Sequence, residues 1–358
     1  MLSKMKLEET TMKGLIKRII SVSMALLLAV TVLHGTHLTV YAGYGSGNYK
    51  QAPPSGQPVG ASFKLNGSAA VDNNYPNTVI LTADRLSMRG SVYSTIKLQL
   101  SSPFKTEAYI YQGCADGRYG ELADGMTFIM HNDPRGNNAQ GMDGAALGSY
   151  GTNAITNSIA IEFDTYYNGD AIWPSTDPAR PGDLSFVSHC AFAFPKATRI
   201  TSADHIRTQW YRRSETWRQL NIEWTPQYFG SELGGTLSYY FQGTNANSSY
   251  TITSVRNTFG STEVWWGFTG ATGAHSSINA VAFKSYPVKK YPVYISYFKD
   301  DFGGELLGHI VLELPPGSPI TGYSASLYAP SGYITPGAIS GDTVAKSPYS
   351  LVNVVYKK

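Results

Sequence analysis

Four oxygen-bearing side chains follow one another at steps of two within the stretch IAIEFDTYYN: Glu162, Asp164, Tyr166 and Asn168. In a β-strand, side chains at alternate positions lie on one face, so this spacing predicts that the four groups converge. The mainly apolar residues between them would then face a core. Calcium binds several oxygen ligands, chiefly carboxylates, amides and backbone carbonyls. The pattern therefore predicts a metal-dependent binding site at the end of a strand.

Alternating charge is also typical of a solvated strand face, and this alternative would need no metal. Tyr166 and Asn168 extend the row beyond the carboxylates, however, and another carboxylate, Asp177, follows closely. An Asp-Gly pair such as that at Asp124 would by itself suggest only a turn. Here it directly precedes the strand-like run MTFIMHNDP, which favours a functional role.

The elements that must position these residues are short β-rich runs separated by Gly, Asn, Asp and Pro. No long helical periodicity occurs. The runs between residues 61 and 286 are too many for a small barrel, so they predict two large sheets packed face to face, an all-β sandwich. They include SFKL, NTVILT, TIKLQL, AYIY, MTFIM, SIAIEF, LSFVS, QLNIEW, TLSYYF and VWWGF.

Changes in composition divide the chain. Residues 43–57 are rich in Gly, Pro and Ser and predict a flexible lead-in, followed by the sandwich at 58–287. In SYPVKKYPV, Pro287 and Pro292 flank two lysines, which predicts a linker because Pro disfavours central strands. Residues 288–358 then form a small β unit with the runs VYISYF, HIVLEL and LVNVVY.

Residues 1–42 have the pattern of a secretory signal peptide. Basic residues precede an apolar run from Ile19 to Leu33, and small residues up to Ala42 suit cleavage there. The run is shorter than the ~20 residues that span a bilayer, and no second one follows, so no transmembrane segment is expected in the mature chain. We expect a secreted, extracellular protein, with association with the cell surface as an alternative.

The expected leader also accounts for the net charge. It holds 5 Lys/Arg and 2 Glu, so 28 − 5 = 23 basic and 25 − 2 = 23 acidic residues remain. A neutral chain without a basic stripe argues against nucleic acid as a partner. Cys114 and Cys190 both lie in the exported part, where a disulfide or two separate thiols are compatible with the sequence.

The region from about 61 to 286 resembles a bacterial L-type (legume-type) lectin domain, a concanavalin A-like jelly roll. Four motifs in the family's order carry the resemblance: FKLNGSAA with VILTADRLSMRGSVYS, then ADGMTFIMHNDPRGNNAQG, IAIEFDTYYN and WWGFTGATGA. The C-terminal unit resembles a mucin-binding-protein (MucBP) repeat through VYISYFKDDFGGEL, SGYITPG and VNVVYKK.

The lectin resemblance implies roles for single residues. Asp124, after a cis peptide bond with Ala123, would accept hydrogen bonds from sugar hydroxyls. Glu162 would hold Mn²⁺ or another transition metal, and Asp164 would bridge that ion to Ca²⁺. The backbone carbonyl of Tyr166 would bind calcium while its ring stacks on the sugar. Asn168 would bind calcium through its carbonyl oxygen and donate to the sugar through its amide nitrogen, a double use that a carboxylate cannot provide.

The chain departs from the family pattern in two places. The family's second Asp matches Asp177 in an Asp-Pro step, but an insertion precedes it, and Asp170 is a nearer alternative. For the family's metal-binding His, Asp183 stands near the expected place and His189 follows later, so both are candidate ligands.

The second departure is in a loop that would supply a backbone N–H to the sugar. Here Gly144 and Ala145 stand where the family favours two Gly, and Ala restricts φ. Ala274 and His275 begin the expected specificity loop. His131, His205 and His309 fit no pattern, so we assign them no role.

The resemblance implies a secreted or surface bacterial lectin or adhesin that binds glycans or mucin-like glycoproteins with calcium and without catalysis. A glycoside hydrolase on the same sandwich is an alternative. One such family uses a Glu-x-Asp-x-Glu strand, but this chain has Tyr166 at the third position, where the general acid is expected. Another alternative is an adhesin whose sugar site is degenerate and which binds protein.

Overall fold

The computed structural model describes residues 47–114, 122–169, 177–178, 187–212, 214–288, 290–315, 318–346 and 348–358. The expected signal peptide and the candidate ligands Asp170 and Asp183 lie outside these residues. Among the described residues, no helix combines the length and the apolar character needed to cross a bilayer.

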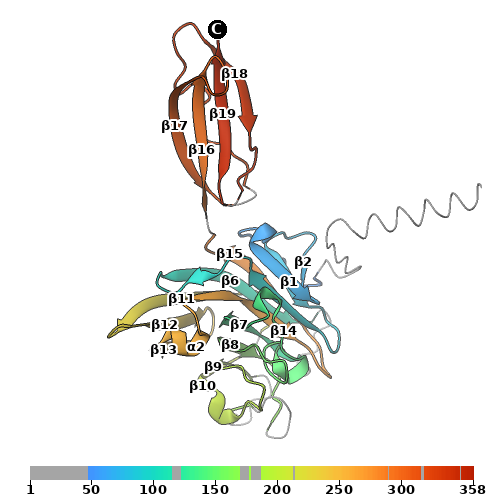
Figure 1. The fold of residues 1–358 in the computed structure, drawn as a ribbon. Helices are drawn as coiled ribbons and strands as arrows, with labels where there is room; N and C mark the ends of the chain where they lie inside the picture. Colours follow the sequence, from blue (N-terminus) through green and yellow to red (C-terminus); the bar gives the residue numbers. More distant parts are fainter. Residues whose placement is uncertain are drawn as a thin grey trace, which may run out of the picture. The chain divides into compact units, whose positions relative to one another are not determined.

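Two antiparallel sheets form a sandwich (Figure 1). The first sheet has the order β1 (Phe63–Gly67), β4 (Arg89–Ser94), β14 (Glu263–Ala271), β7 (Gly125–His131), β8 (Ser158–Asp164), β9 (Val187–Ala193) and β10 (Ile206–Arg212), and β5 (Leu98–Gln99) pairs with β14. The second has the order β13 (Asn247–Ile252), β12 (Glu232–Phe241), β11 (Arg218–Phe229), β6 (Phe104–Gly113), β15 (Ile278–Ser285), β3 (Thr78–Thr82) and β2 (Ala70–Val71).

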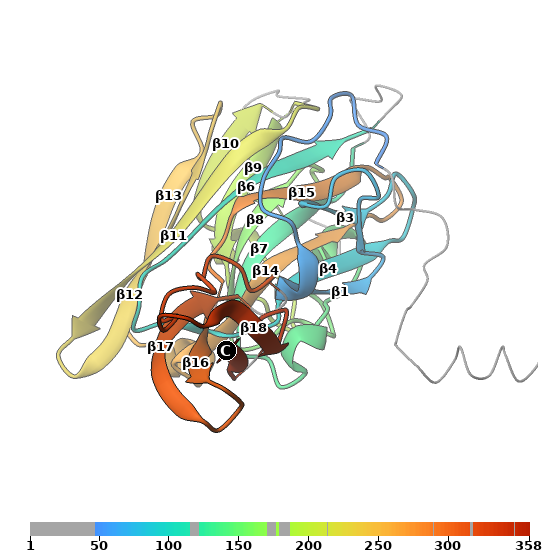
Figure 2. The same ribbon diagram turned by 90° about the horizontal axis from the view of Figure 1, so that it is seen from above.

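Helical elements in the described residues are short. They are the single α-helical turn α2 (Val255–Phe259) and the 3₁₀ turns η1 (Gly60–Ser62), η2 (Gly136–Asn138), η3 (Gly144–Ala146) and η4 (Ser202–Asp204). Seen from above, the long strands of the two sheets overlie one another (Figure 2). The prediction of an all-β sandwich with a small C-terminal β unit is confirmed.

The core lies between the two sheets and follows the alternation that the sequence predicts for β8. Ile159, Ile161 and Phe163 belong to the large buried cluster, and the ring of Phe163 lies 5.6 Å from that of Phe241 on the second sheet. Glu162 points away from this cluster, to the face where its hydrogen-bond partners lie. One strand therefore serves the core with one face and the candidate site with the other.

The C-terminal sheet has the order β17 (Glu305–Leu314), β16 (Tyr291–Lys299), β19 (Ser350–Lys357) and β18 (Ile334–Gly341), with β16 parallel to β19. It has a separate core that includes Ile295, Tyr297, Val354 and Tyr356. Pro292 lies inside β16, so the expectation that it belongs to a linker was wrong. Pairing of β16 with β19 begins only at Val293, so the missing N–H of Pro292 leaves that ladder intact.

Some local predictions differ from the structure. Of the run TIKLQL, only Leu98–Gln99 is a strand. The row of oxygen donors is a strand only as far as Asp164, because β8 ends there and Tyr166 and Asn168 lie in the following loop. Cys114 and Cys190 are both buried, and neither forms a disulfide in the described part of the chain.

Candidate functional site

All seven residues predicted to contact sugar line one pocket of about 430 Å³. Four loops build it: those before β7, around η3, after β8 and after β14. The pocket also contains residues that sequence reasoning did not single out, namely Met142, Asp143, Tyr167 and Gly273. The predicted residues in it are Asp124, Gly144, Ala145, Tyr166, Asn168, Ala274 and His275.

Backbone hydrogen bonds fix Asp124 at the start of β7. Its peptide bond with Ala123 is cis, its N–H donates to the carbonyl of Ala271 at 3.0 Å, and its carbonyl accepts from Thr165 N at 2.9 Å. The Asp124 side chain is buried, and its Oδ2 atom has no hydrogen-bond partner among the described residues. Burial raises the pKa of Asp124 to about 7, with a further contribution from the charge of Asp143. The pocket thus presents a buried carboxylate that is held in place at the start of β7.

The η3 loop accommodates alanine where the family resemblance favours glycine. The left-handed backbone conformation falls on Gly144, with φ of 59°, and on Leu147, with φ of 53°. Ala145 lies within the 3₁₀ turn and is not among the described residues with positive φ. The Gly-to-Ala departure therefore does not by itself distort this loop. A Cβ atom on Gly273 opposite would lie 3.1 Å from Asp124 Oδ2, so that position suits glycine.

A local turn, rather than strand periodicity, directs the residues after β8 into the pocket. The N–H of Tyr166 donates to Asp164 Oδ1 at 2.8 Å, an Asx-type turn. The Tyr166 ring stacks on His275, with 5.0 Å between ring centroids and 30° between planes. The N–H of Asn168 donates to Asp177 Oδ2 at 2.5 Å. These bonds connect the pocket to the carboxylates beneath it.

Two groups of possible metal ligands lie next to each other and share His189. One comprises Asp164, Asp177 and His189, and the other comprises Glu162, His189 and His205, all of them buried. In the sheet, His189 on β9 stands directly opposite Asp164 on β8. Of the predicted metal ligands, the structure brings together Glu162, Asp164, Tyr166, Asn168, Asp177 and His189.

The charges of this cluster favour a cation. Burial raises the pKa of Asp164 well above its usual range, and the negative charges of Asp177 and Glu162 raise it further. Burial also raises the pKa of Asp177. Burial alone would raise the pKa of Glu162, but the imidazoles of His205 and His189 lower it below its ordinary value. A divalent ion among these groups would let all the carboxylates ionise together.

The donor set fits calcium on one side of the cluster. The Oδ1 atom of Asn168 is buried and has no hydrogen-bond partner among the described residues, although buried polar atoms are normally satisfied. The backbone N–H of the same residue binds Asp177, so the loop that carries this amide is tied to that carboxylate. Oxygen donors of this kind are what calcium requires.

Sequence reasoning missed His205. Its Nε2 atom lies 3.1 Å from Glu162 Oε1, beside the Nε2 atom of His189 at 3.0 Å from the same oxygen. The sequence carried no signal for it, because the family resemblance places the ligating His near Asp183 and only the adjacency of β8, β9 and β10 brings His205 to Glu162.

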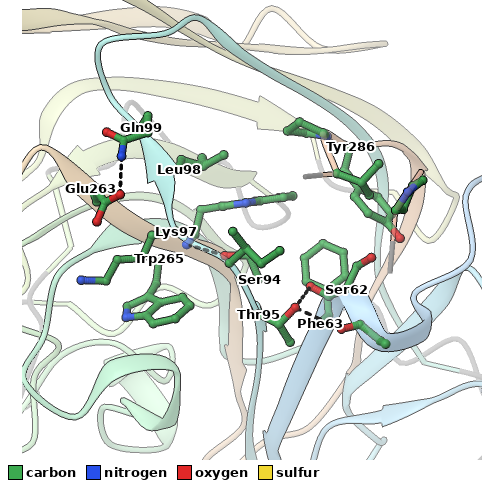
Figure 3. Close-up of a pocket in the computed structure, with 16 residues that line it drawn as sticks. Ser62, Phe63, Ser94, Thr95, Lys97, Leu98, Gln99, Glu263, Trp265 and Tyr286 are labelled. Carbon is green, nitrogen blue, oxygen red and sulfur yellow. Dashed lines mark hydrogen bonds between the residues drawn. The ribbon is translucent and has the colours of Figure 1, made fainter. Parts of the chain in front are cut away.

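A second pocket lies beside β1, β5 and β14 and has a different character (Figure 3). Gln99 bonds to Glu263, and Lys97 donates to Asn132 at 2.7 Å while its ammonium lies 5.6 Å from the centre of the Trp265 ring. Glu263 is the single acidic residue among those described that line it. Its charged groups are already paired, so the candidate site is the pocket at Asp124.

The legume lectin beta-barrel domain family matches residues 56–285. Similar solved structures include a Bauhinia forficata lectin in complex with GalNAc, at 19% identity over 64% of this chain and 93% of that one, with a TM-score of 0.45. Winged bean acidic lectin with methyl-α-D-galactose has 18% identity over 65% and 96%, with a TM-score of 0.43.

A metal-free form of lectin I-B4 from Griffonia simplicifolia is also similar, at 18% identity over 64% of this chain and 92% of that one, with a TM-score of 0.43. Domains of the matched family bind carbohydrate without catalysis, and legume lectins generally hold Ca²⁺ and Mn²⁺. The family match covers more than half of the sequence. This chain belongs to the legume (L-type) lectin domain family.

Proposed function

We propose that this protein is a calcium-dependent lectin whose sugar site is the pocket at Asp124. The observation that carries the proposal is that one residue, Asn168, belongs both to the pocket and to the carboxylate cluster beneath it. Asn168 lines the pocket, while its N–H binds Asp177 and its Oδ1 atom is buried without a partner. A calcium ion bound by Asp164, Asp177, Asn168 and the carbonyl of Tyr166 would fix the loop that faces the sugar.

Each polar group of the pocket has a part in this proposal. Asp124, ionised, accepts hydrogen bonds from two sugar hydroxyls. Asn168 donates through Nδ2 while Oδ1 binds the ion, and the backbone N–H of Ala145 supplies a further donor. The N–H of Gly144 already donates to the carbonyl of Thr272 at 3.1 Å, so Gly144 would contact the sugar without donating to it. The stacked rings of Tyr166 and His275 offer an apolar edge for the sugar. Such a site selects a monosaccharide by the positions of its hydroxyls.

The burial of Glu162 argues against a hydrolase. A retaining glycosidase needs two carboxyl groups about 5 Å apart that both reach the sugar. Glu162 is 1% exposed, its Oε2 accepts from Tyr150 at 2.8 Å, and its Oε1 faces two imidazoles. This carboxylate is therefore placed to hold an ion, not to attack a glycosidic bond.

The cellular setting remains part of the proposal. The leader-like residues 1–42 support secretion, and the C-terminal β unit at 288–358 suits a MucBP-like contact module or spacer of a bacterial surface adhesin. Mucin-like glycoproteins would then be the natural partners. A single lectin site gains modest free energy because each polar contact replaces a contact with water. Several copies displayed on one surface would raise the avidity.

Chelation tests the proposal. The purified protein is applied to a glycan array in calcium, after EDTA treatment, and after calcium is restored. We expect binding to a defined set of glycans, its loss with EDTA, and its return with calcium. Binding that survives complete removal of metal would refute the mechanism, and the absence of binding to any glycan in calcium would favour the degenerate adhesin.

A further inference from the structure

His205 is held in a defined orientation by a turn built for it. Thr201 and Asp204 form a capping box around η4, in which Thr201 N donates to Asp204 Oδ2 at 2.7 Å. Lys196 donates to the other oxygen of Asp204 at 2.6 Å. The Nδ1 atom of His205 lies 2.8 Å from the carbonyl oxygen of Thr201. The imidazole is thus fixed from behind, as metal-binding imidazoles usually are.

This anchoring determines which nitrogen faces Glu162. The Thr201 carbonyl only accepts, so Nδ1 of His205 carries a hydrogen, and in a neutral ring Nε2 would carry the lone pair. That lone pair points at Glu162 Oε1, 3.1 Å away, and this oxygen is itself an acceptor. Two acceptors facing each other in a buried place require a proton or a cation between them. A shared proton would make an imidazolium–carboxylate pair, whereas a metal ion would be bound by both groups at once.

The donor types select the cation. His189 and His205 both direct Nε2 toward Glu162, their ring centroids are 5.5 Å apart, and their side chains are 3% and 1% exposed. Calcium prefers an all-oxygen set, whereas two imidazoles and a carboxylate suit zinc, cobalt or nickel. The other ring nitrogen of His189, Nδ1, lies 3.8 Å from Asp177 Oδ1, in the oxygen-rich group that also contains Asp164. The cluster therefore divides into an oxygen side and a nitrogen side.

We propose that Glu162, His189 and His205 bind a transition-metal ion through two imidazoles, and that His205 makes this position prefer zinc-like ions over manganese. The inference rests on the proposed function in one respect: the ion would sit beside the calcium that shapes the sugar pocket. His205 is then a ligand that determines metal specificity, one that contacts no sugar. Affinity for Mn²⁺, which favours oxygen donors, would depend on it less.

The test compares metal affinities of the full protein after metal has been stripped. Zn²⁺, Co²⁺ and Mn²⁺ are titrated into the wild type, His205→Gln and a matched control, His309→Gln, on the exposed face of β17. We expect His205→Gln to lower Zn²⁺ and Co²⁺ affinity by at least about tenfold, as loss of a supporting or direct ligand does, and to lower Mn²⁺ affinity less. The visible absorption bands of bound Co²⁺ should change, and the control should match the wild type.

Unchanged zinc affinity and cobalt absorption in folded His205→Gln would overturn the inference. A fall in thermal stability alone would do so too, because it would indicate a simple imidazolium–carboxylate pair. If that variant does not fold, zinc-edge X-ray absorption of the loaded wild type counts the imidazoles: two are expected, and one or none would refute the proposal. Glycan binding in calcium is measured separately, so a failure of the lectin function is distinguishable from a failure of the two-imidazole site.

Discussion

Asn168 is the residue through which the ion and the sugar would act on each other. Replacing it with Asp keeps the size of the side chain and an oxygen toward the ion but removes the amide donor toward the sugar. We expect Asn168→Asp to lose glycan binding while keeping its calcium-dependent stability. Binding is measured on the array and folding by circular dichroism. Asn247→Asp, on the exposed part of β13, is the control, and full binding by Asn168→Asp would contradict the proposed double role.

The buried acids predict an unusual pH dependence for the metal-free protein. The pKa of Asp124 is about 7 in the folded protein against 3.8 in an unfolded chain, so the folded state holds more protons between these values. Stability should therefore fall as pH rises from 5 to 7. The raised pKa values of Asp164 and Asp177 act in the same direction. The lowered pKa of Glu162 changes the stability only below pH 4.5, the pKa of this group in an unfolded chain, and so has no effect between pH 5 and pH 7.

Urea unfolding of the chelated protein at pH 5 and pH 7 measures this effect. Asp124→Asn should show a shallower fall, because one of the groups responsible is gone. Calcium should remove or reverse the fall, since ion binding requires ionised carboxylates. Stability of the chelated wild type that rises over this interval would mean that these acids are not buried as described.

How much of the site could be predicted from the sequence depended on how local its geometry is. The sequence predicts that Glu162, Asp164 and Asn168 belong to the metal site, because they lie within seven residues on one strand and the turn that follows it. It does not predict the same of His205, because the place of this residue at Glu162 depends on three adjacent strands and on the capping turn at Thr201. The sequence also could not predict that Ala145 fits its loop, because this depends on which neighbouring residue has a positive φ.

At the scale of elements, β8 couples the core to the site. Phe163 is fully buried and packs against Tyr239 and Phe241 of the second sheet. Phe163→Ala should lower the free energy of unfolding by about 3–5 kcal/mol through the cavity that it leaves. Denaturant unfolding in calcium measures it. Tyr228→Ala, at a side chain 64% exposed, should stay within about 0.5 kcal/mol of the wild type. Equal effects of the two substitutions would contradict the assigned core.

Sequence patterns predict some of the strands and miss others. Hydrophobic alternation identified the core face of β8 because a one-residue shift would reverse its two faces. It did not identify short or polar strands such as β10, whose pairing with β9 depends on partners distant in the sequence. The prolines of SYPVKKYPV predict a linker, whereas Pro292 lies at the start of β16, where the pairing with β19 has not yet begun.

At the scale of the whole molecule, the sandwich and the C-terminal sheet have separate hydrophobic cores. Because calcium would bind only the sandwich, it should raise the melting temperature of one part alone. We expect two transitions in differential scanning calorimetry, of which one moves with calcium concentration. Tyr297→Ala, in the core of the C-terminal sheet, should lower only the other transition and leave glycan binding unchanged. A single transition that responds to both changes would show that the two cores unfold together.

The most direct test is a crystal structure determined in millimolar calcium, with an anomalous difference map. The account predicts an ion bound by Asp164, Asp177, Asn168 Oδ1 and the carbonyl of Tyr166, with the amide nitrogen of Asn168 facing the pocket at Asp124. The proposal would be contradicted if crystals in millimolar calcium showed no anomalous peak among these residues and if their oxygen atoms pointed away from one another.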